Sequence, residues 1–257
     1  MTKHWMIVPQ RKEPVKLRIF ALPYAGGSAG AYRAWVRMSR VGIHVAGIEY
    51  PGHGMRMDEP LETDIRQLTS GVADRLEQEV DSEYAIFGHS MGATVAFELV
   101  RELSRRGARR PVHLFVSGAA APHDHGGDSG FEMSDRGIID RLQKLGATPR
   151  ELLEHPELRN HIVNVMRADG TALGNYCPGT REPVDVPIIA FGGTDDPLVA
   201  PSALEEWRSW TTRNFQAYVH RGDHFYLFDH MERLFVTMAR AAATELSRLH
   251  GVEGGMR

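Results

Sequence analysis

The sequence predicts an α/β fold in which a mostly parallel central sheet carries helices on both faces. First, short apolar or β-branched runs alternate with helical patterns along most of the chain. Second, a Gly-x-Ser-x-Gly turn at 88–92 lies between an apolar run and a helical pattern. Third, a long segment from about 123 to 183 contains helical patterns without an intervening strand. These features together indicate βαβ units with one helical insertion.

The individual elements can be located from their apolar periodicity. Runs typical of buried strands occur at 17–23, 42–51, 84–88, 112–118, 186–193 and 215–222. Amphipathic helical stretches lie between several of them and include Ile65, Leu68, Val72 and Leu76, and later Leu234, Met238, Ala241 and Glu245. With 257 residues, 42% of them hydrophobic, the chain can bury a substantial core, so we expect a single domain over residues 1–257.

The insertion at about 123–183 begins with the polar, glycine-rich stretch HDHGGDSG. Helical signals follow, because Thr148-Pro149-Arg150-Glu151 matches a capping box with proline at the first helical position. An apolar stripe then contains Leu158, Ile162, Val165 and Met166. Parallel sheets place ligand sites outside the carboxyl ends of their strands, so we expect this insertion to form a lid over such a site.

Composition excludes several classes of function. The formal net charge of −3, the pI near 6.5 and the lack of a long basic stretch argue against a nucleic-acid partner. Cys177 is the only cysteine, so no intramolecular disulfide can form. In addition, no spacing of cysteine and histidine resembles a structural zinc site. The first 16 residues lack the apolar core of a signal peptide. The sequence also contains no run of about 18 apolar residues, the length that a membrane-spanning helix needs. We therefore expect a cytoplasmic protein with no membrane partner.

Ser90 is the candidate nucleophile. It lies at a bend between the apolar strand run that starts at Tyr84 and a helical pattern that starts at Ala93. Gly88 and Gly92 remove the Cβ atoms that would clash in such a tight turn. This pattern is the nucleophile elbow of α/β-hydrolases, and it refines the predicted architecture to that fold.

A serine nucleophile needs a base, and in this fold the partners follow in the order Ser, acid, His. His224 follows the last predicted strand and lies on a glycine-containing turn, which makes it the favoured base. An ordinary surface-loop histidine is the alternative interpretation. His220 should still belong to the strand, and His89 is expected to pack beneath the elbow.

The acid should follow the preceding strand, where Asp195 and Asp196 are adjacent. Asp196 is favoured because Gly193, Asp196 and Val199 reproduce the Gly-x-x-Asp-x-x-Val pattern that often occurs in this loop of α/β-hydrolases, and Asp195 would then be a turn residue. A simple Asp-Pro turn, with neither aspartate catalytic, is the alternative.

Two backbone N–H groups must stabilise the oxyanion of an acyl-transfer intermediate. The N–H of Met91, directly after the nucleophile, is one candidate. The second should come from the glycine-rich loop LPYAGGSAGAYRAW, where Ala25 is favoured and Tyr24 or Gly26 are adjacent alternatives. A phosphate-binding loop or a plain turn is the other interpretation of this loop, but neither a G-K-[ST] nor a G-x-G-x-x-G motif is present.

An ordered set of motifs over nearly the whole chain resembles the standalone type II thioesterases of polyketide and nonribosomal peptide assembly lines. The motifs are LPYAGGSAGAYRAW, YPGHGMR at 50–56, FGHSMGA at 87–93, MRADGTALGNY at 166–176, GGTDDPLV at 192–199 and GDHFYL at 222–227. The elbow alone is common to α/β-hydrolases, whereas the ordered set is specific.

The resemblance implies an enzyme that hydrolyses acyl groups from the phosphopantetheine arm of acyl or peptidyl carrier proteins, removing aberrant units or releasing intermediates. By position, Ser90 is the nucleophile, His224 the base and Asp196 the orienting acid. His53 is a departure, because arginine often occupies this place in the family. No metal or organic cofactor is implied, and His123-Asp124-His125 is expected to be part of a loop rather than a zinc site. We expect a monomer that acts in trans.

A carrier could dock at one of two basic regions. The densest, SRRGARRP at 104–111, should lie at the end of a helix of about 15 residues, roughly 22 Å from the elbow, so it is disfavoured. Arg33, Arg37 and Arg56 should lie nearer the mouth of the site. Apolar lid residues Leu152, Leu153, Met166 and Leu173 either line the acyl chamber or pack the lid on the core.

Two other functions remain open from the sequence. The same catalytic set would suit a hydrolase of small soluble esters or acyl-CoA that has no carrier partner. A noncatalytic carrier-binding module on a hydrolase scaffold is the third interpretation, although such a module has no need of all three catalytic residue types.

Overall fold

The computed structural model describes residues 5–10, 14–40, 42–122, 134–146, 148 and 150–253. The opening of the predicted lid insertion, with His123-Asp124-His125, lies outside the described residues, as does Pro149 of the predicted capping box.

The strands form one sheet with the order β1-β3-β2-β4-β5-β6-β7. They are β1 (Met6–Ile7), β2 (Leu17–Leu22), β3 (Ile43–Ile48), β4 (Glu83–His89), β5 (Leu114–Ser117), β6 (Ile188–Gly193) and β7 (Phe215–His220). β1 pairs antiparallel with β3, and every other pairing is parallel. Each of the six predicted strand runs overlaps one of β2 to β7, so the mostly parallel sheet is confirmed. The sequence does not predict β1, a two-residue strand at the edge of the sheet.

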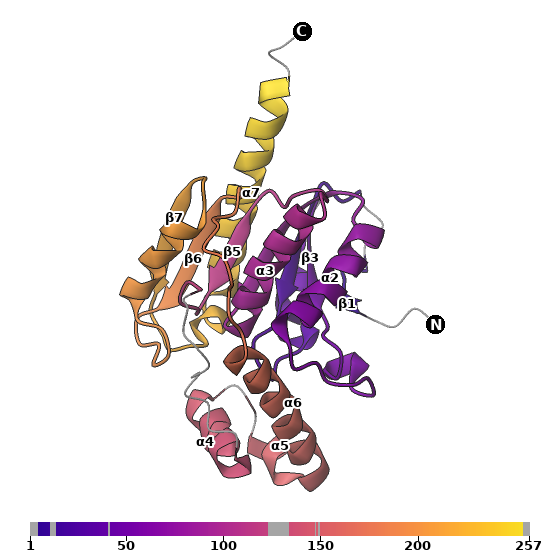
Figure 1. The fold of residues 1–257 in the computed structure, drawn as a ribbon, viewed down its shortest axis with the longest axis vertical. Coiled ribbons are helices and arrows are strands. Elements are labelled where there is room, and N and C mark those ends of the chain that lie inside the picture. The colour runs from indigo at the N-terminus through magenta and orange to yellow at the C-terminus, as the bar shows by residue number, and fades with distance from the viewer. Residues whose placement is uncertain are drawn as a thin grey trace.

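Helices cover both faces of this sheet, as Figure 1 shows. The α-helices are α1 (Arg33–Met38), α2 (Ile65–Glu79), α3 (Met91–Arg105), α4 (Asp135–Leu145), α5 (Arg150–Glu154), α6 (Pro156–Gly174) and α7 (Met231–Glu253). Short 3-10 helices are η1 (Ala29–Tyr32), η2 (Gly54–Arg56), η3 (Pro201–Trp210) and η4 (Tyr226–Phe228). The helices α2 and α3 pack on one face, and α1 and α7 pack on the other.

Alternation along the strands builds the two core layers. In β2, Leu17, Ile19 and Ala21 contribute to the cluster shared with α1 and α7. Phe20 and Leu22 point the opposite way and join the cluster shared with α2 and α3. All five side chains are at most 1% exposed, as expected for a parallel strand covered on both faces.

The insertion between β5 and β6 contributes α4, α5 and α6. Figure 1 shows these helices together at one end of the molecule, with α7 extending from the opposite end. Their own apolar cluster consists of Ile138, Leu142, Leu153, Val163 and Met166. The Ser134 hydroxyl caps α4 by accepting the Gly137 N–H (3.1 Å), and Gly146 ends this helix in a left-handed conformation (φ 68°). The insertion thus has a small core of its own.

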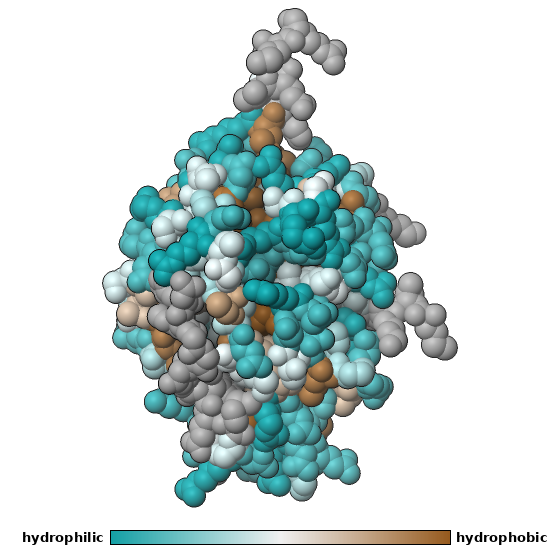
Figure 2. All heavy atoms as spheres, viewed as in Figure 1, coloured by the Kyte–Doolittle hydropathy of each residue, from teal (hydrophilic) through white to brown (hydrophobic). Residues whose placement is uncertain are grey.

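The face of the molecule seen in Figure 2 is largely hydrophilic, and its hydrophobic residues occur as small separate spots outside the grey atoms. Within the described ranges, no helix has the length and apolar character needed to cross a lipid bilayer.

Candidate active site

Ser90 occupies the turn between β4 and α3 in a strained conformation. Its φ of 55° and ψ of −120° make it the one non-glycine residue with positive φ in the described part of the chain. The Ser90 N–H donates to the Ser117 carbonyl on β5 (2.8 Å), which fixes the turn against the neighbouring strand. Strain of this kind persists only where the surrounding structure enforces it.

The two flanking glycines are required by close backbone contacts. A Cβ atom on Gly88 would lie 2.6 Å from the Ala93 nitrogen, and one on Gly92 would lie 2.6 Å from the Pro23 carbonyl oxygen. These are backbone atoms, so no side-chain rotation can relieve the overlap. The elbow therefore lies directly against the loop that follows β2.

His224 and Asp196 form a buried pair beside this elbow. The Nδ1–H of His224 donates to the Asp196 Oδ2 (2.8 Å), and the two side chains are 3% and 0% exposed. The other oxygen of Asp196 accepts the N–H groups of Leu198 (2.8 Å) and Val199 (3.2 Å). With Nδ1 protonated toward the carboxylate, Nε2 of the neutral ring carries the lone pair, as a general base requires.

A glycine lets the loop after β6 and the loop after β7 approach each other. A Cβ atom on Gly193, at the end of β6, would lie 2.5 Å from the Gly222 carbonyl oxygen. Asp195 has a different role from its neighbour, because its exposed carboxylate accepts the Thr194 hydroxyl (2.7 Å) and its N–H donates to Gly222 (2.9 Å). Asp195 thus belongs to the turn that connects the two loops.

The other two histidines considered from the sequence are held by aromatic packing. His220, on β7, stacks on Tyr226 (5.8 Å between ring centroids), and burial lowers its pKa. His89 is fully buried, and its ring centroid lies 4.9 Å from that of His224. Gly118 makes room for both rings, since a Cβ there would lie 2.5 Å from the Cε1 of His89 and 3.3 Å from that of His224.

His89 is part of a buried hydrogen-bonded chain. Its Nδ1 lies 2.9 Å from the Ser117 hydroxyl, which in turn lies 2.6 Å from the Tyr226 hydroxyl. Burial, followed by the nearby His224, holds the pKa of His89 well below its ordinary value, so this ring is neutral. His89 therefore packs against the ring of His224 without adding a charge to it.

The loop after β2, which lies against the elbow, contains a backbone N–H without an acceptor among the described residues. The Gly26 N–H donates to Asp169 Oδ2 on α6 (2.7 Å), and the Gly27 N–H donates to the Tyr24 carbonyl (2.8 Å). Among the described residues, the N–H of Ala25 has no such acceptor. On the other side, Met91 is the first residue of α3, so its N–H has no carbonyl one turn earlier to bind.

The four apolar lid residues have different environments. Leu153 and Met166 lie in the apolar cluster of the insertion, which also contacts Ala25. The Met166 side chain packs directly on Gly26. Leu173 packs against the main core beneath the lid, whereas Leu152 is 38% exposed. Of these four residues, Met166 is thus the one that the structure brings to the loop after β2.

The predicted docking arginines also differ. Arg33 and Arg37 are exposed on α1 beside a shallow hollow that includes Val8 and Met55. Arg56 is engaged within the protein, because its Nε and Nη2 bind both carboxylate oxygens of Glu59 (2.9 and 2.8 Å) and its Nη1 donates to the Glu49 carbonyl (2.8 Å). A guanidinium held in this way has few donors left for a partner.

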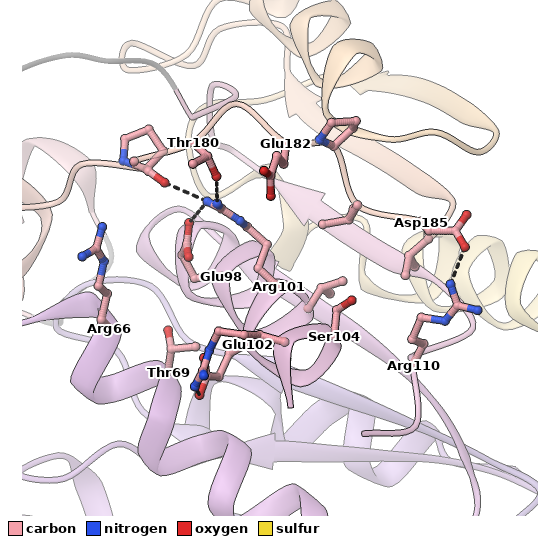
Figure 3. Close-up of a pocket in the computed structure, with 17 residues that line it drawn as sticks. Arg66, Thr69, Glu98, Arg101, Glu102, Ser104, Arg110, Thr180, Glu182 and Asp185 are labelled. Carbon is pink, nitrogen blue, oxygen red and sulfur yellow. Dashed lines mark hydrogen bonds and ion pairs between the residues drawn. The ribbon is translucent and has the colours of Figure 1, made fainter. Parts of the chain in front are cut away.

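The basic stretch at 104–111 lies beside a groove of about 730 Å³ between α3 and residues 178–186 (Figure 3). Its arginines are paired with acids of this chain. Arg106 binds Asp74 (2.6 Å) and Glu77 (2.7 Å), and Arg110 binds Asp185. Arg101, on the same groove, binds Glu98 (2.9 Å), the Pro178 carbonyl (2.8 Å) and the Thr180 hydroxyl (2.6 Å). This groove is therefore electrostatically compensated and lies along the part of α3 away from the elbow.

The described residues contain no group of three or more histidine, cysteine, aspartate or glutamate side chains placed to hold a metal ion.

The seven-stranded sheet, the Ser90 elbow and the insertion after β5 define an α/β-hydrolase. Comparison with known proteins gives the family. A family model described as "Thioesterase domain" matches residues 17–241, and the chain belongs to this thioesterase family.

Relatives from biosynthetic pathways match nearly the whole chain. The gramicidin S biosynthesis protein GrsT of Aneurinibacillus migulanus is 35% identical over 226 residues, which cover 88% of each chain. RedJ, a thioesterase from the prodiginine pathway of Streptomyces coelicolor, is 34% identical, with a TM-score of 0.83 and coverage of 91% of this chain and 95% of RedJ. The type II thioesterase BorB from the borrelidin cluster is 30% identical, with a TM-score of 0.82 and coverage of 93% and 97%. The resemblance to type II thioesterases inferred from the motifs is confirmed.

Proposed function

We propose that this protein is a type II thioesterase that hydrolyses acyl groups from the phosphopantetheine arm of acyl or peptidyl carrier proteins in polyketide or nonribosomal peptide biosynthesis. The observation that carries this proposal is the Ser90 elbow beside the buried His224–Asp196 pair, in a chain of the thioesterase family. We assign the enzyme to the serine hydrolases, acting as one domain over residues 1–257 with the lid included.

In the first half of the reaction, the Ser90 hydroxyl oxygen attacks the thioester carbonyl carbon while the Nε2 of His224 accepts the hydroxyl proton. Asp196 keeps the ring in the required tautomer through the 2.8 Å bond to Nδ1 and stabilises the imidazolium that forms. The C–S bond then breaks, the imidazolium returns its proton to the departing sulfur, and the pantetheine thiol leaves an acyl-Ser90 ester.

In the second half, a water molecule attacks the acyl-Ser90 carbonyl and gives a proton to the Nε2 of His224. Collapse of the tetrahedral intermediate breaks the bond to Ser90, which regains its proton, and the free acid is released. The N–H groups of Met91 and Ala25 are our candidates for the oxyanion hole in both halves, since the neighbouring Gly26 and Gly27 N–H groups are already used. No metal or organic cofactor is needed for these steps.

We propose that the carrier docks over α1, with Arg33 and Arg37 facing its acidic surface. The two guanidiniums are exposed beside the apolar hollow that includes Val8 and Met55, whereas Arg56 is already bound to Glu59. The docking proposal therefore depends on Arg33 and Arg37. Met166, packed on Gly26, is our candidate for contact with the acyl chain.

The central experiment measures single-turnover hydrolysis of matched acyl groups from a phosphopantetheinylated carrier protein and from acyl-pantetheine. We expect faster release from the carrier, and a loss of at least about 10³-fold in Ser90→Ala. Equal rates on both substrates would instead indicate an esterase or acyl-CoA hydrolase without a carrier partner. Carrier binding without hydrolysis would indicate the noncatalytic module.

The docking proposal has its own test. Arg33→Glu and Arg37→Glu should each weaken turnover of carrier-bound substrate while acyl-pantetheine turnover is unchanged. Arg105→Glu, which makes the same charge change at the far end of α3, is the matched control. Unchanged carrier turnover in both α1 variants would refute docking at this surface.

We further propose that the enzyme works in the cytoplasm, since its one cysteine, the exposed Cys177, suits a reducing compartment. We also propose that it is a monomer. Sedimentation of the enzyme with and without carrier would test the oligomeric state.

A further inference from the structure

Three segments that are distant in sequence meet at one buried carboxylate. Asp169 on α6 has a side chain that is 0% exposed, and its Oδ2 accepts both the Gly26 N–H (2.7 Å) and the Nε2–H of His53 (3.0 Å). Gly26 belongs to the loop after β2, and His53 follows β3 at the start of η2. The carboxylate thus joins the lid helix to the loop that carries Ala25.

We propose that His53 and Asp169 are positioning residues: their ion pair holds the oxyanion loop in its productive conformation only while His53 is protonated. This inference rests on the proposed function, because it assigns a role to the Ala25 N–H in thioester hydrolysis. It adds a source of pH dependence that lies outside the proposed triad of Ser90, His224 and Asp196.

Beside an ionised Asp169, the hydrogen-bond geometry requires the charged form of His53. Its Nδ1 lies 2.8 Å from the Pro51 carbonyl oxygen, which can only accept a hydrogen bond. Its Nε2 faces the Oδ2 of the Asp169 carboxylate, which has no proton to donate and also accepts the Gly26 N–H. A neutral imidazole carries one N–H, whereas the imidazolium carries two. Both contacts are satisfied only by the imidazolium.

The surroundings of His53 favour its positive charge. The ring is 3% exposed, and burial alone would lower its pKa, but Asp169, the Pro51 carbonyl and Glu49 together raise the pKa above its ordinary value. Glu49, directly after β3, is buried, and its carboxylate accepts the N–H groups of Ala29 (3.0 Å) and Met55 (3.2 Å). Tyr50 is a further titratable neighbour, and its ring centroid lies 5.7 Å from that of His53.

Loss of the proton would affect the oxyanion loop directly. Neutral His53 can keep only one of its two hydrogen bonds, and Asp169 would become a buried carboxylate without a compensating cation, a strongly unfavourable arrangement. Asp169 also holds the Gly26 N–H, so its displacement would move the peptide next to the Ala25 N–H. A single oxyanion donor contributes about 10²- to 10³-fold to rate, so partial displacement should reduce the rate by roughly tenfold.

The key experiment compares the pH dependence of kcat and KM on acyl-pantetheine for the wild type and His53→Arg. Arginine stays charged over the accessible pH range, so it preserves the cation without the titration. We expect the wild-type kcat to fall about tenfold on the alkaline side with KM little changed, and the His53→Arg profile to remain flat there. His53→Gln should be slower at every pH. Coincident alkaline profiles for the wild type and His53→Arg would overturn the proposal.

A second measurement does not depend on turnover or on a stable His53→Gln variant. In Ser90→Ala, NMR titration should show the amide signals of Ala25 and Gly26 shifting with the same midpoint as the ring of His53. Amide signals that do not follow this midpoint would refute the coupling. If the wild type hydrolyses no thioester but the amide signals do follow His53, the proposed function fails and the ion-pair coupling stands.

Discussion

Gly92→Ala is the sharpest test of how the elbow is built. The added Cβ would lie 2.6 Å from the Pro23 carbonyl oxygen, with the Leu22 carbonyl oxygen closer still. Ordinary contact begins at 3.4 Å and the Leu22 oxygen would lie at 2.3 Å, so the elbow must separate from the end of β2 and the loop after it by at least 1.1 Å, which is 3.4 minus 2.3. These two segments carry the Met91 and Ala25 N–H groups, one on each side of the proposed oxyanion position.

The separation should cost more in rate than in stability. A misplacement of about 1 Å at a reacting centre can reduce the rate by roughly 10²-fold, and we expect a loss of that size in single-turnover acylation by acyl-pantetheine. Overpacking costs about 1–3 kcal/mol, and replacing glycine by alanine in a helix returns up to about 1 kcal/mol. The free energy of unfolding in urea should therefore fall by no more than about 3 kcal/mol.

Gly71→Ala provides the matched control. Gly71 lies on α2, and a Cβ there has no heavy atom within 4 Å. The same substitution should leave the acylation rate unchanged and raise the free energy of unfolding by up to about 1 kcal/mol. A Gly92→Ala enzyme with the wild-type acylation rate would refute the argument that this close approach sets the geometry of the oxyanion hole.

Two further predictions concern the charged groups. Asp196→Asn should reduce kcat by about 10³- to 10⁴-fold, because the amide favours the wrong tautomer of His224. The kcat of Asp195→Asn should stay within a few-fold of the wild type. Equal losses of kcat in the two variants would contradict the assignment of Asp196 as the acid. His53 has a raised pKa in the folded state, so its stabilisation should be complete below about pH 6.5 and lost as the pH rises through the folded pKa. Urea unfolding at pH 6 and pH 9 should show this loss in the wild type but not in His53→Arg.

The sheet could be predicted because parallel strands buried on both faces leave a local signature. β4 is an apolar run over Tyr84–Phe87, and β6 follows the same rule at 188–193. β1 has no such signature, since two residues show no periodicity and the pairing of Met6 with Ile48 depends on the position of β3. Short edge strands of this kind are defined by their partner.

Sequence reasoning could favour one of two adjacent aspartates only through a motif. Asp195 and Asp196 have identical chemistry, and each could form an Asx turn before Pro197. In the structure, the two carboxylates point in different directions. The Asp196 carboxylate divides its oxygens between His224 and two backbone N–H groups, and Asp195 turns to Thr194 and solvent. Which of two neighbouring side chains points inward depends on the backbone turn after β6, which local composition does not determine.

The contact between His53 and Asp169 was beyond sequence reasoning for a different reason. Both residues belong to motifs that were recognised, YPGHGMR and MRADGTALGNY, but they are 116 positions apart and on different elements. A histidine in a glycine-containing loop and an aspartate within an amphipathic helix each have an ordinary local interpretation. Only the packing of α6 across the ends of β2 and β3 brings them together, and it does so at the backbone N–H next to Ala25. Because α6 places the buried Asp169 carboxylate against this loop, the proposed lid helps to position the proposed oxyanion hole. A substitution that displaces α6 should therefore lower kcat on acyl-pantetheine, a substrate that makes no carrier contact.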